Sequence, residues 1–477
     1  MSKKLYMLGI DGFSYEYIEK HLENLPNLKC LFQEGKCKKL GTIFPPDSIP
    51  AWISIFTGFT PAEHGVLDSI DYLDKTKRKA PSTEAFKGKT FWDDLTKEGK
   101  KVCIINPFMA FPVWDVNGFF VNGSVFSSEK NIDANDKELF KKYKVPNLGG
   151  FTTFPQKSEL GQFIEDNVQE TKDLESYAKL LHEHDDYDLF FVTYFMMDRY
   201  QHFLWRYSDE EDITHPRNNP FKTSIPDFYK LYDKMIGNVK VGLKNDESLI
   251  VISDHGFGRR CTKVININEI LRKNGYYFVE TKKIKLFDKK YLIEKVKNIV
   301  TDVVFRFDLE DIFYKLVKLV PNRKAIKQGK HLQSNSNIAE ACTMFGTNFW
   351  GGIRINKDNI PAGQTYENVR NEIKGLFENY TYKGRKIFKW LKNREEIYDG
   401  GKNIAKYADI LFLLDSAYGV NWAIFTKEIG YNFTHKKISG GHNPAGCFFT
   451  YNLDENLFEQ VNSILDINSL VKDFYKS

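Results

Sequence analysis

Acidic residues and histidines recur in three short motifs of the 477-residue chain. Asp198 and His202 in MMDRYQHF are spaced i, i+4, so on a helix they would share one face and could bind one cation. Asp254 and His255 in VISDHGFG directly follow an apolar run, and His442 in SGGHNPAG is flanked by glycines that would let the backbone approach an ion. Each motif alone fits a helix cap, a turn or a hydrogen-bonded histidine. Their joint occurrence favours a metal site.

The segment FPPDSIPAWISIFTGFTPAEHG, residues 44–65, places Ser48 among three prolines, which stiffen the backbone and remove hydrogen-bond donors. A helix-compatible run follows at 51–56. A serine at a helix N-terminus is commonly its cap. The same position also suits a group that reacts with phosphate, because free N–H groups and the helix dipole favour anions there. Composition alone leaves both interpretations open.

Short apolar runs that end in a polar residue predict the elements that position these groups. They are Leu5–Ile10 before Asp11, Val102–Ile105 before Asn106, Leu189–Phe195 before Asp198, and Leu249–Ser253 before Asp254. Runs of this length are typical of strands buried on both faces, and helical periodicity lies between them, for example at 91–98 and 225–243. The pattern predicts an α/β fold with a mostly parallel central sheet and helices on both faces. Ligands bind beyond the carboxyl ends of such strands, where three carboxylates would repel one another unless a cation held them.

The full set of motifs resembles the type I phosphodiesterase/nucleotide pyrophosphatase family of the alkaline phosphatase superfamily. In chain order the pattern is an Asp after the first strand, a Ser in PxxSxPAWxSxxTGxxPxxHG, an Asp-xxx-His, an Asp-His-Gly and a late Gly-His, which are Asp11, Ser48, Asp198, His202, Asp254, His255 and His442. The resemblance runs over residues 5 to 450. It implies an alkaline phosphatase-like fold and a hydrolase with two divalent metal ions.

The resemblance also implies how the ligands divide between the two ions. Asp11, Asp254 and His255 would hold one ion, which would also contact the oxygen of Ser48. The other ion would be held by Asp198, His202 and His442. Mixed His and Asp ligands suit Zn²⁺ best, with Mn²⁺ as the alternative.

Ser48 is then expected to be the nucleophile that cleaves a phosphodiester, of nucleotide or pyrophosphate type, through a covalent phospho-Ser48 intermediate. One departure concerns Ser69, which stands where the nucleotide pyrophosphatase branch has a phosphate-binding asparagine. His64 belongs to the motif but is interpreted as structural. The alternatives are a phosphomonoesterase or phosphotransferase with the same site, and a non-catalytic metal-binding protein. A sulfatase is disfavoured because Trp52 stands where that motif has arginine.

A basic segment at 281–330 has eight more Lys and Arg than Asp and Glu, which exceeds the net charge of +5 for the whole chain. It is predicted to be a helical insertion or cap, with a solvated face or with a field that attracts an anionic substrate or surface. We therefore divide the chain into a first core part at 1–264, an insertion at 265–345 and a return to the core at 346–477. The runs FWGGIRIN at 349–356 and GCFFTYN at 446–452 are predicted to be strands of that core.

The composition excludes several other classes of protein. With 42% hydrophobic and 15% aromatic residues the chain can bury a large core, which excludes a disordered protein. The small net charge does not indicate specific nucleic-acid binding, so the expected partner is a small-molecule phosphate ester. No apolar run reaches the roughly 20 residues of a membrane span or forms a secretory signal, and a cytoplasmic location is expected.

Overall fold

The computed structural model describes residues 3–67, 83–125, 131–149, 154–244, 247–278, 337–342, 348–432 and 434–476. They form two units. The first comprises Met1–Arg259, Gly400–Lys406 and Ile438–Ser477, and the second comprises Arg260–Asp399 and Tyr407–Lys437. The basic segment at 281–330 lies outside the described residues.

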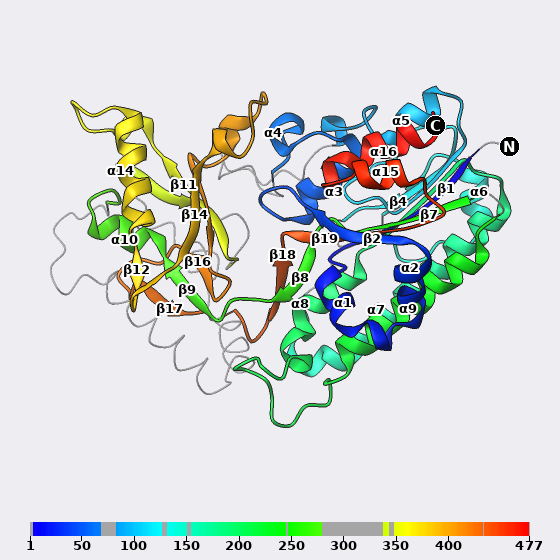
Figure 1. The fold of residues 1–477 in the computed structure, drawn as a ribbon, viewed down its shortest axis with the longest axis horizontal. Helices are drawn as coiled ribbons and strands as arrows, with labels where there is room; N and C mark the ends of the chain where they lie inside the picture. The colour runs from blue at the N-terminus through cyan, green and yellow to red at the C-terminus, as the bar shows by residue number, and fades with distance from the viewer. Residues whose placement is uncertain are drawn as a thin grey trace. The chain divides into compact units, whose positions relative to one another are not determined.

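The first unit is built on an eight-stranded sheet in the order β2-β19-β7-β1-β6-β3-β4-β5 (Figure 1). In that order the strands are Lys36–Gly41, Ala445–Tyr451, Glu247–Ile252, Lys4–Ile10, Leu189–Tyr194, Val102–Ile105, Gly118–Gly123 and Ile132–Ala134. The five strands from β7 to β4 run parallel, whereas β19 is antiparallel to its two neighbours and β5 to β4. The central strands are the predicted apolar runs, and their side chains are buried on both faces because helices cover both. The predicted mostly parallel sheet is confirmed.

Helices pack on the two faces of this sheet (Figure 1). One face is covered by α1 (Tyr15–His21), α2 (Pro26–Glu34), α7 (Leu160–His184), α8 (Met196–Ser208) and α9 (Ser224–Gly242). The other face is covered by α3 (Ser48–Thr57), α5 (Phe91–Lys97), α15 (Glu455–Gln460) and α16 (Ile467–Phe474), while α4 (Pro61–His64) packs beside α3. On that second face Phe191 of β6 contacts Phe56 of α3 and Trp92 of α5, with ring centroids 6.0 and 6.3 Å away. Aromatic packing therefore fixes α3, which carries Ser48, against the sheet.

The second unit has its own antiparallel sheet in the order β10-β11-β15-β14. These strands are Ala339–Cys342, Trp350–Ile355, Ile410–Leu414 and Phe388–Asn393, and α10 (Ile267–Lys273) and α14 (Tyr366–Glu378) share a buried apolar core with them. Smaller sheets join β16 (Tyr418–Asn421), β9 (Lys263–Asn266) and β17 (Ile429–Tyr431), and β12 (Thr381–Tyr382) with β13 (Arg385–Lys386).

The two units divide the chain differently from the segments 1–264, 265–345 and 346–477. The run FWGGIRIN forms β11, which pairs antiparallel with β10 and β15 instead of joining the core sheet. The run GCFFTYN does join the core sheet, as β19. Except for Gly400–Lys406, the chain returns to the first unit at Ile438 and not at residue 346.

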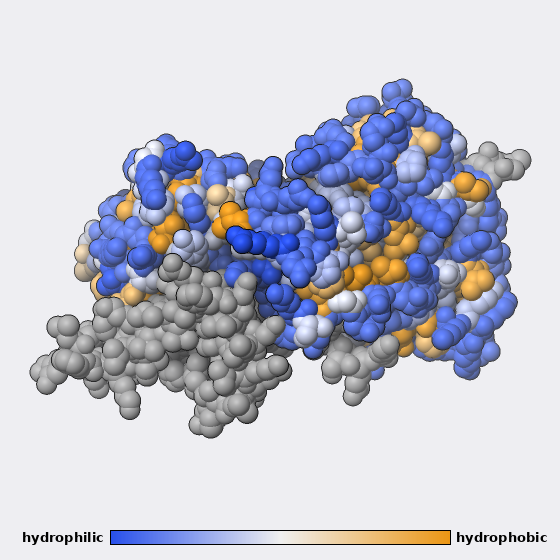
Figure 2. Space-filling model, turned by 90° about the horizontal axis from the view of Figure 1, so that it is seen from below, coloured by the Kyte–Doolittle hydropathy of each residue, from blue (hydrophilic) through white to orange (hydrophobic). Residues whose placement is uncertain are grey.

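The surface seen in Figure 2 is mainly hydrophilic over the described residues, with apolar residues in a few patches. Most large apolar side chains lie instead in the cores of the two units. Among the described residues, no helix is both long enough and apolar enough to span a bilayer.

Candidate metal centre and active site

Three acidic residues meet at one edge of the core sheet because the strands that precede them are parallel neighbours. Asp11 directly follows β1, Asp254 follows β7 by one residue, and Asp198 lies in the first turn of α8, just after β6. All three carboxylates lie at the carboxyl ends of these strands, as predicted. His202 follows Asp198 by one turn of the same helix, so the i, i+4 spacing does place both on one face.

His442 reaches the same place from the end of the chain. Its strand β18 (Gly440–Asn443) pairs antiparallel with β8 (Gly256–Arg259), and His442 lies opposite Phe257. The strand β8 begins right after His255, so this pairing brings His442 beside the Asp-His-Gly motif. The ring centroids of His255 and His442 are 3.7 Å apart.

Ser48 is the first residue of α3 and not its cap. The cap is Asp47, whose carboxylate accepts a hydrogen bond from the N–H of Ile49 at 3.1 Å. Interpreting Ser48 as the capping residue is therefore wrong, because its side chain points to the acidic cluster. Its Oγ lies 3.2 Å from Asp11 Oδ1, to which it donates, and 3.0 Å from His255 Nε2.

Two groups of potential ligands surround this point. In the first, ligand atoms of Asp11, Asp254 and His255 all lie within 4.8 Å of one another, and all three residues are buried. This is the first ligand set implied by the resemblance. Within it His255 Nε2 lies 3.3 Å from Asp254 Oδ2 and 3.7 Å from Asp11 Oδ1.

The second group centres on Asp198. Its Oδ2 lies 3.3 Å from His202 Nε2 and its Oδ1 lies 3.1 Å from His442 Nε2, while the two imidazole nitrogens are 3.1 Å apart. His255 also lies within ligand distance of Asp198 and His442, with their ligand atoms within 4.8 Å of one another. The two predicted sets are therefore adjacent, and His255 can contribute to either. All seven residues of the pattern meet in one cluster.

The three histidines of the cluster, His202, His255 and His442, are oriented as metal ligands would be. Each turns its Nδ1 to a backbone carbonyl oxygen at 2.9 to 3.0 Å, and the three carbonyl groups belong to Gly440, Gly256 and Pro46. A neutral imidazole that donates from Nδ1 presents a lone pair at Nε2, and all three Nε2 atoms face the carboxylates. Asp254 Oδ2 is buried and accepts no hydrogen bond within the described part of the chain. This donor set fits divalent cations, which would satisfy those lone pairs.

The pKa values of the carboxyl groups reflect the crowding of negative charge. Burial, with Asp254 and Asp198 nearby, raises the pKa of Asp11 well above its ordinary value. Burial and the charge of Asp198 likewise raise the pKa of Asp254 to about 8. Burial alone would lower the pKa of His442, but its hydrogen bond to Asp198 and the charge of that group raise it to about 9. Protons thus compete for the positions that cations would take.

His64, which the sequence analysis interprets as structural, lies apart from this cluster. It is buried, its Nδ1 accepts a hydrogen bond from the N–H of Val66, and its Nε2 lies 3.2 Å from Ser54 Oγ. These contacts join α3 to the end of α4. Ser69 lies outside the described residues.

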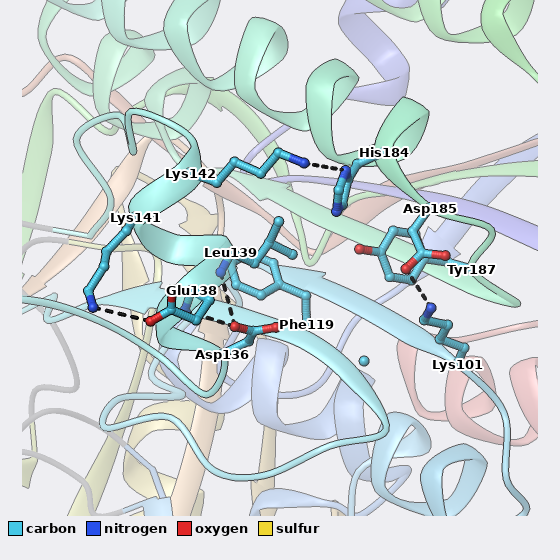
Figure 3. A pocket seen from close by; sticks show the side chains of 11 residues that line it. Lys101, Phe119, Asp136, Glu138, Leu139, Lys141, Lys142, His184, Asp185 and Tyr187 are labelled. Carbon is cyan, nitrogen blue, oxygen red and sulfur yellow. Dashed lines mark hydrogen bonds and ion pairs between the residues drawn. The ribbon is translucent and has the colours of Figure 1, made fainter.

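A separate cavity of about 670 Å³ opens at the amino ends of β3, β4 and β6, opposite the cluster (Figure 3). Its charged side chains are largely paired with one another, as in Lys101 with Asp185 at 2.5 Å and Lys141 with Glu138 at 3.3 Å. Among the described residues that line it there is no serine and one histidine, His184. The cavity therefore does not combine a serine with several histidines and carboxylates, as the cluster does.

Residues 5–344 match the family model of type I phosphodiesterases/nucleotide pyrophosphatases. The chain belongs to this family. Its curated relatives include ectonucleotide pyrophosphatase/phosphodiesterase family member 1 of Rattus norvegicus, 24% identical over 276 residues, and that of Homo sapiens, 22% identical over 281 residues. Both alignments cover 56% of this chain and only 25% of the relative.

The fold is also found in a solved structure, phosphonoacetate hydrolase from Sinorhizobium meliloti 1021 in complex with phosphonoacetate. It superposes with a TM-score of 0.58 at 13% sequence identity, covering 99% of this chain and 96% of the other. The similarity confirms the alkaline phosphatase-like arrangement of the family.

Proposed function

We propose that the protein is a metal-dependent phosphodiesterase that uses Ser48 as its nucleophile and two divalent cations, Zn²⁺ or Mn²⁺. The main support for this proposal is the position of Ser48 Oγ, which lies 3.0 Å from His255 Nε2 and 3.2 Å from Asp11 Oδ1, inside a cluster of seven family motif residues. Membership of the type I phosphodiesterase/nucleotide pyrophosphatase family supports phosphoester hydrolysis.

The residues of the cluster would divide into two ligand sets. Asp11, Asp254 and His255 would hold one cation beside Ser48, and Asp198, His202 and His442 would hold the other. Bound there, the cations would stabilise the alkoxide of Ser48 and the negative charge that develops on the leaving oxygen.

The reaction then proceeds in two displacements at phosphorus. The Ser48 hydroxyl proton faces two acceptors, Asp11 Oδ1 and His255 Nε2, and leaves the oxygen as the Oγ–P bond forms. The P–O bond to the first alcohol breaks, and that alcohol takes up a proton. Water next attacks phospho-Ser48, restores the serine hydroxyl and releases a phosphomonoester.

Asp47 favours a diester over a monoester as the substrate. It adjoins Ser48, it is buried, and its charge contributes to the raised pKa of His442. Its carboxylate also accepts a hydrogen bond from the Ile49 N–H at the start of α3. That N–H is therefore not available to a phosphate oxygen. A negative charge here repels a dianionic monoester more strongly than a monoanionic diester.

The test compares Ser48→Ala with Ser54→Ala, a change on the same helix at a serine that bonds to His64 instead of the cluster. Hydrolysis of bis-p-nitrophenyl phosphate by metal-loaded protein should be lost in Ser48→Ala and kept in Ser54→Ala. Acid quenching during turnover should trap a phosphoryl group on Ser48 that mass spectrometry detects. Turnover of Ser48→Ala at the wild-type rate would contradict the proposal.

Two alternatives have their own outcomes in the same assay. Faster hydrolysis of p-nitrophenyl phosphate than of the diester would identify a phosphomonoesterase with the same nucleophile. Failure to hydrolyse either ester, with both cations bound, would favour a non-catalytic metal-binding protein.

A further inference from the structure

Trp52 makes a polar contact at the cluster that its apolar character does not suggest. Its indole Nε1–H donates to Asp11 Oδ2 at 3.0 Å, and the side chain is fully buried. Ser48, four residues earlier on the same helix, donates to the other oxygen of Asp11 at 3.2 Å. Two residues one turn apart on α3 thus bind both oxygens of a single carboxylate.

The indole ring has little room to move. It packs on Phe56, with ring centroids 5.9 Å apart. The ring also lies close to β1, where a methyl group added at Gly9 would be 2.7 Å from the indole Cη2. Since Gly9 and Asp11 lie on the same stretch of chain, the strand that carries the carboxylate also holds the ring that binds it.

We propose that Trp52 is a positioning residue that fixes the orientation of the Asp11 carboxylate for metal binding. The indole N–H occupies Oδ2 and so holds Oδ1 toward Ser48 and His255. Carboxylate ligands are commonly oriented by such outer hydrogen bonds, and loss of one typically costs about 10- to 100-fold in metal affinity or activity. This inference rests on the proposed function, because it assigns Asp11 as a ligand.

The chain offers a matched control in Trp92 of α5. Trp92 is also fully buried, and it packs on Phe56 and Phe191. Its indole nitrogen has no hydrogen-bond partner among the described residues. Replacement of either tryptophan by phenylalanine removes similar apolar volume, but only the change at Trp52 removes a hydrogen bond to the cluster.

The experiment measures binding of Mn²⁺ and of Zn²⁺ alone to the chelator-treated full chain by calorimetry, for wild type, Trp52→Phe and Trp92→Phe. Trp52→Phe should weaken metal binding by about 10- to 100-fold, whereas Trp92→Phe should bind like wild type. A lower kcat for bis-p-nitrophenyl phosphate at saturating metal, without a matching rise in KM, should accompany the change in Trp52→Phe alone. Equal metal affinity in all three proteins would overturn the positioning role.

A second variant keeps the test decisive if Trp52→Phe does not fold. Incorporation of β-(3-benzothienyl)alanine at position 52 keeps the shape of the ring and replaces the N–H by sulfur. It should show the same weakened binding, and wild-type affinity would overturn the proposal. These measurements separate the role of Trp52 from the proposed function. Wild-type protein that binds no metal would contradict the proposed function. Tight metal binding in every variant would contradict only the role of Trp52.

Discussion

The imidazole rings of His255 and His442 stack with centroids 3.7 Å apart and planes inclined by 18°. Each belongs to a different predicted ligand set, one from the Asp-His-Gly motif after β7 and the other from β18. The stack joins the two sets into one cluster, and His255 is close enough to ligands of both.

His255→Ala should therefore reduce metal binding at both positions, whereas His202→Ala should affect one. We expect chelator-stripped protein reloaded with Zn²⁺ to retain fewer ions per chain in His255→Ala than in His202→Ala, measured by elemental analysis. His184→Ala, at the exposed end of α7 and away from the cluster, serves as the control. Equal loss in His202→Ala and His255→Ala would contradict a shared role for His255.

Asp47→Asn should shift specificity toward monoesters. Asparagine still caps a helix, so α3 should be preserved, while the negative charge beside Ser48 is removed. We expect the ratio of monoester to diester kcat/KM to rise roughly tenfold, as about 1.4 kcal/mol of relieved repulsion would give. Asp136→Asn, which changes the equivalent cap of α6 (Lys137–Lys142), should leave the ratio unchanged. An unchanged ratio in Asp47→Asn would show that Asp47 only caps the helix.

A side chain at Gly12 should be destabilising for two reasons, backbone strain and displacement of neighbouring residues of the cluster. Its φ is +68°, and an added Cβ would lie 3.2 Å from Asp198 Cα and 3.1 Å from Phe257 Cδ2. Its N–H also donates to Asp254 Oδ1 at 3.2 Å. Gly12→Ala should lose both stability and metal affinity, because the backbone strain of about 1–2 kcal/mol is joined by displacement of a ligand.

Gly88→Ala isolates the first of these effects. Gly88 has a φ of +80°, but nothing lies within 4 Å of the added Cβ. It should lower the free energy of unfolding by about 1–2 kcal/mol and leave Mn²⁺ affinity unchanged. If the two variants lost metal affinity equally, or neither did, the assigned role of Gly12 would be wrong.

His64 should make the protein sensitive to acid. Burial lowers its pKa from 6.5 to about 3. Between these values the unfolded chain binds a proton at His64 that the folded protein does not, so stability falls as the pH falls from about 6.5 toward 3, by up to about 1.4 kcal/mol per pH unit. In His64→Asn this contribution disappears.

Urea unfolding at pH 7 and pH 5 measures the effect. His64→Asn should be the less stable protein at pH 7, because it loses contacts with Ser54 and Val66. Wild type should then lose about 2 kcal/mol more than the variant on going to pH 5. Parallel pH dependence in the two proteins would show that His64 titrates normally in the folded state.

The core sheet and the cluster could be predicted because their signals are local. The strands β1, β3, β6 and β7 are short apolar runs, and each of the seven motif residues lies in a distinctive segment. Asp11, Asp198 and Asp254 meet because parallel strands end at a common edge, which follows from the fold class alone.

Other features depend on contacts that the sequence does not encode locally. The apolar run of β11 is the same whether it pairs in the core sheet or in a separate antiparallel one. Asn403 belongs to the first unit although it lies far along the chain from the core strands, and its Nδ2 donates to the carbonyl oxygen of Glu63 at 2.9 Å. Trp52 lies four residues after Ser48 on α3, and this spacing is the sequence signal that both residues face Asp11.

A metal titration tests the proposed two-metal phosphodiesterase activity most directly. Zn²⁺ or Mn²⁺ is added to chelator-stripped protein in known amounts per chain, and the rate of bis-p-nitrophenyl phosphate hydrolysis is measured after each addition. Stripped protein should be inactive, and the rate should rise until two ions are bound to each chain and then level off. Full activity in stripped protein, or saturation of both sites with no hydrolysis of the diester, would contradict it.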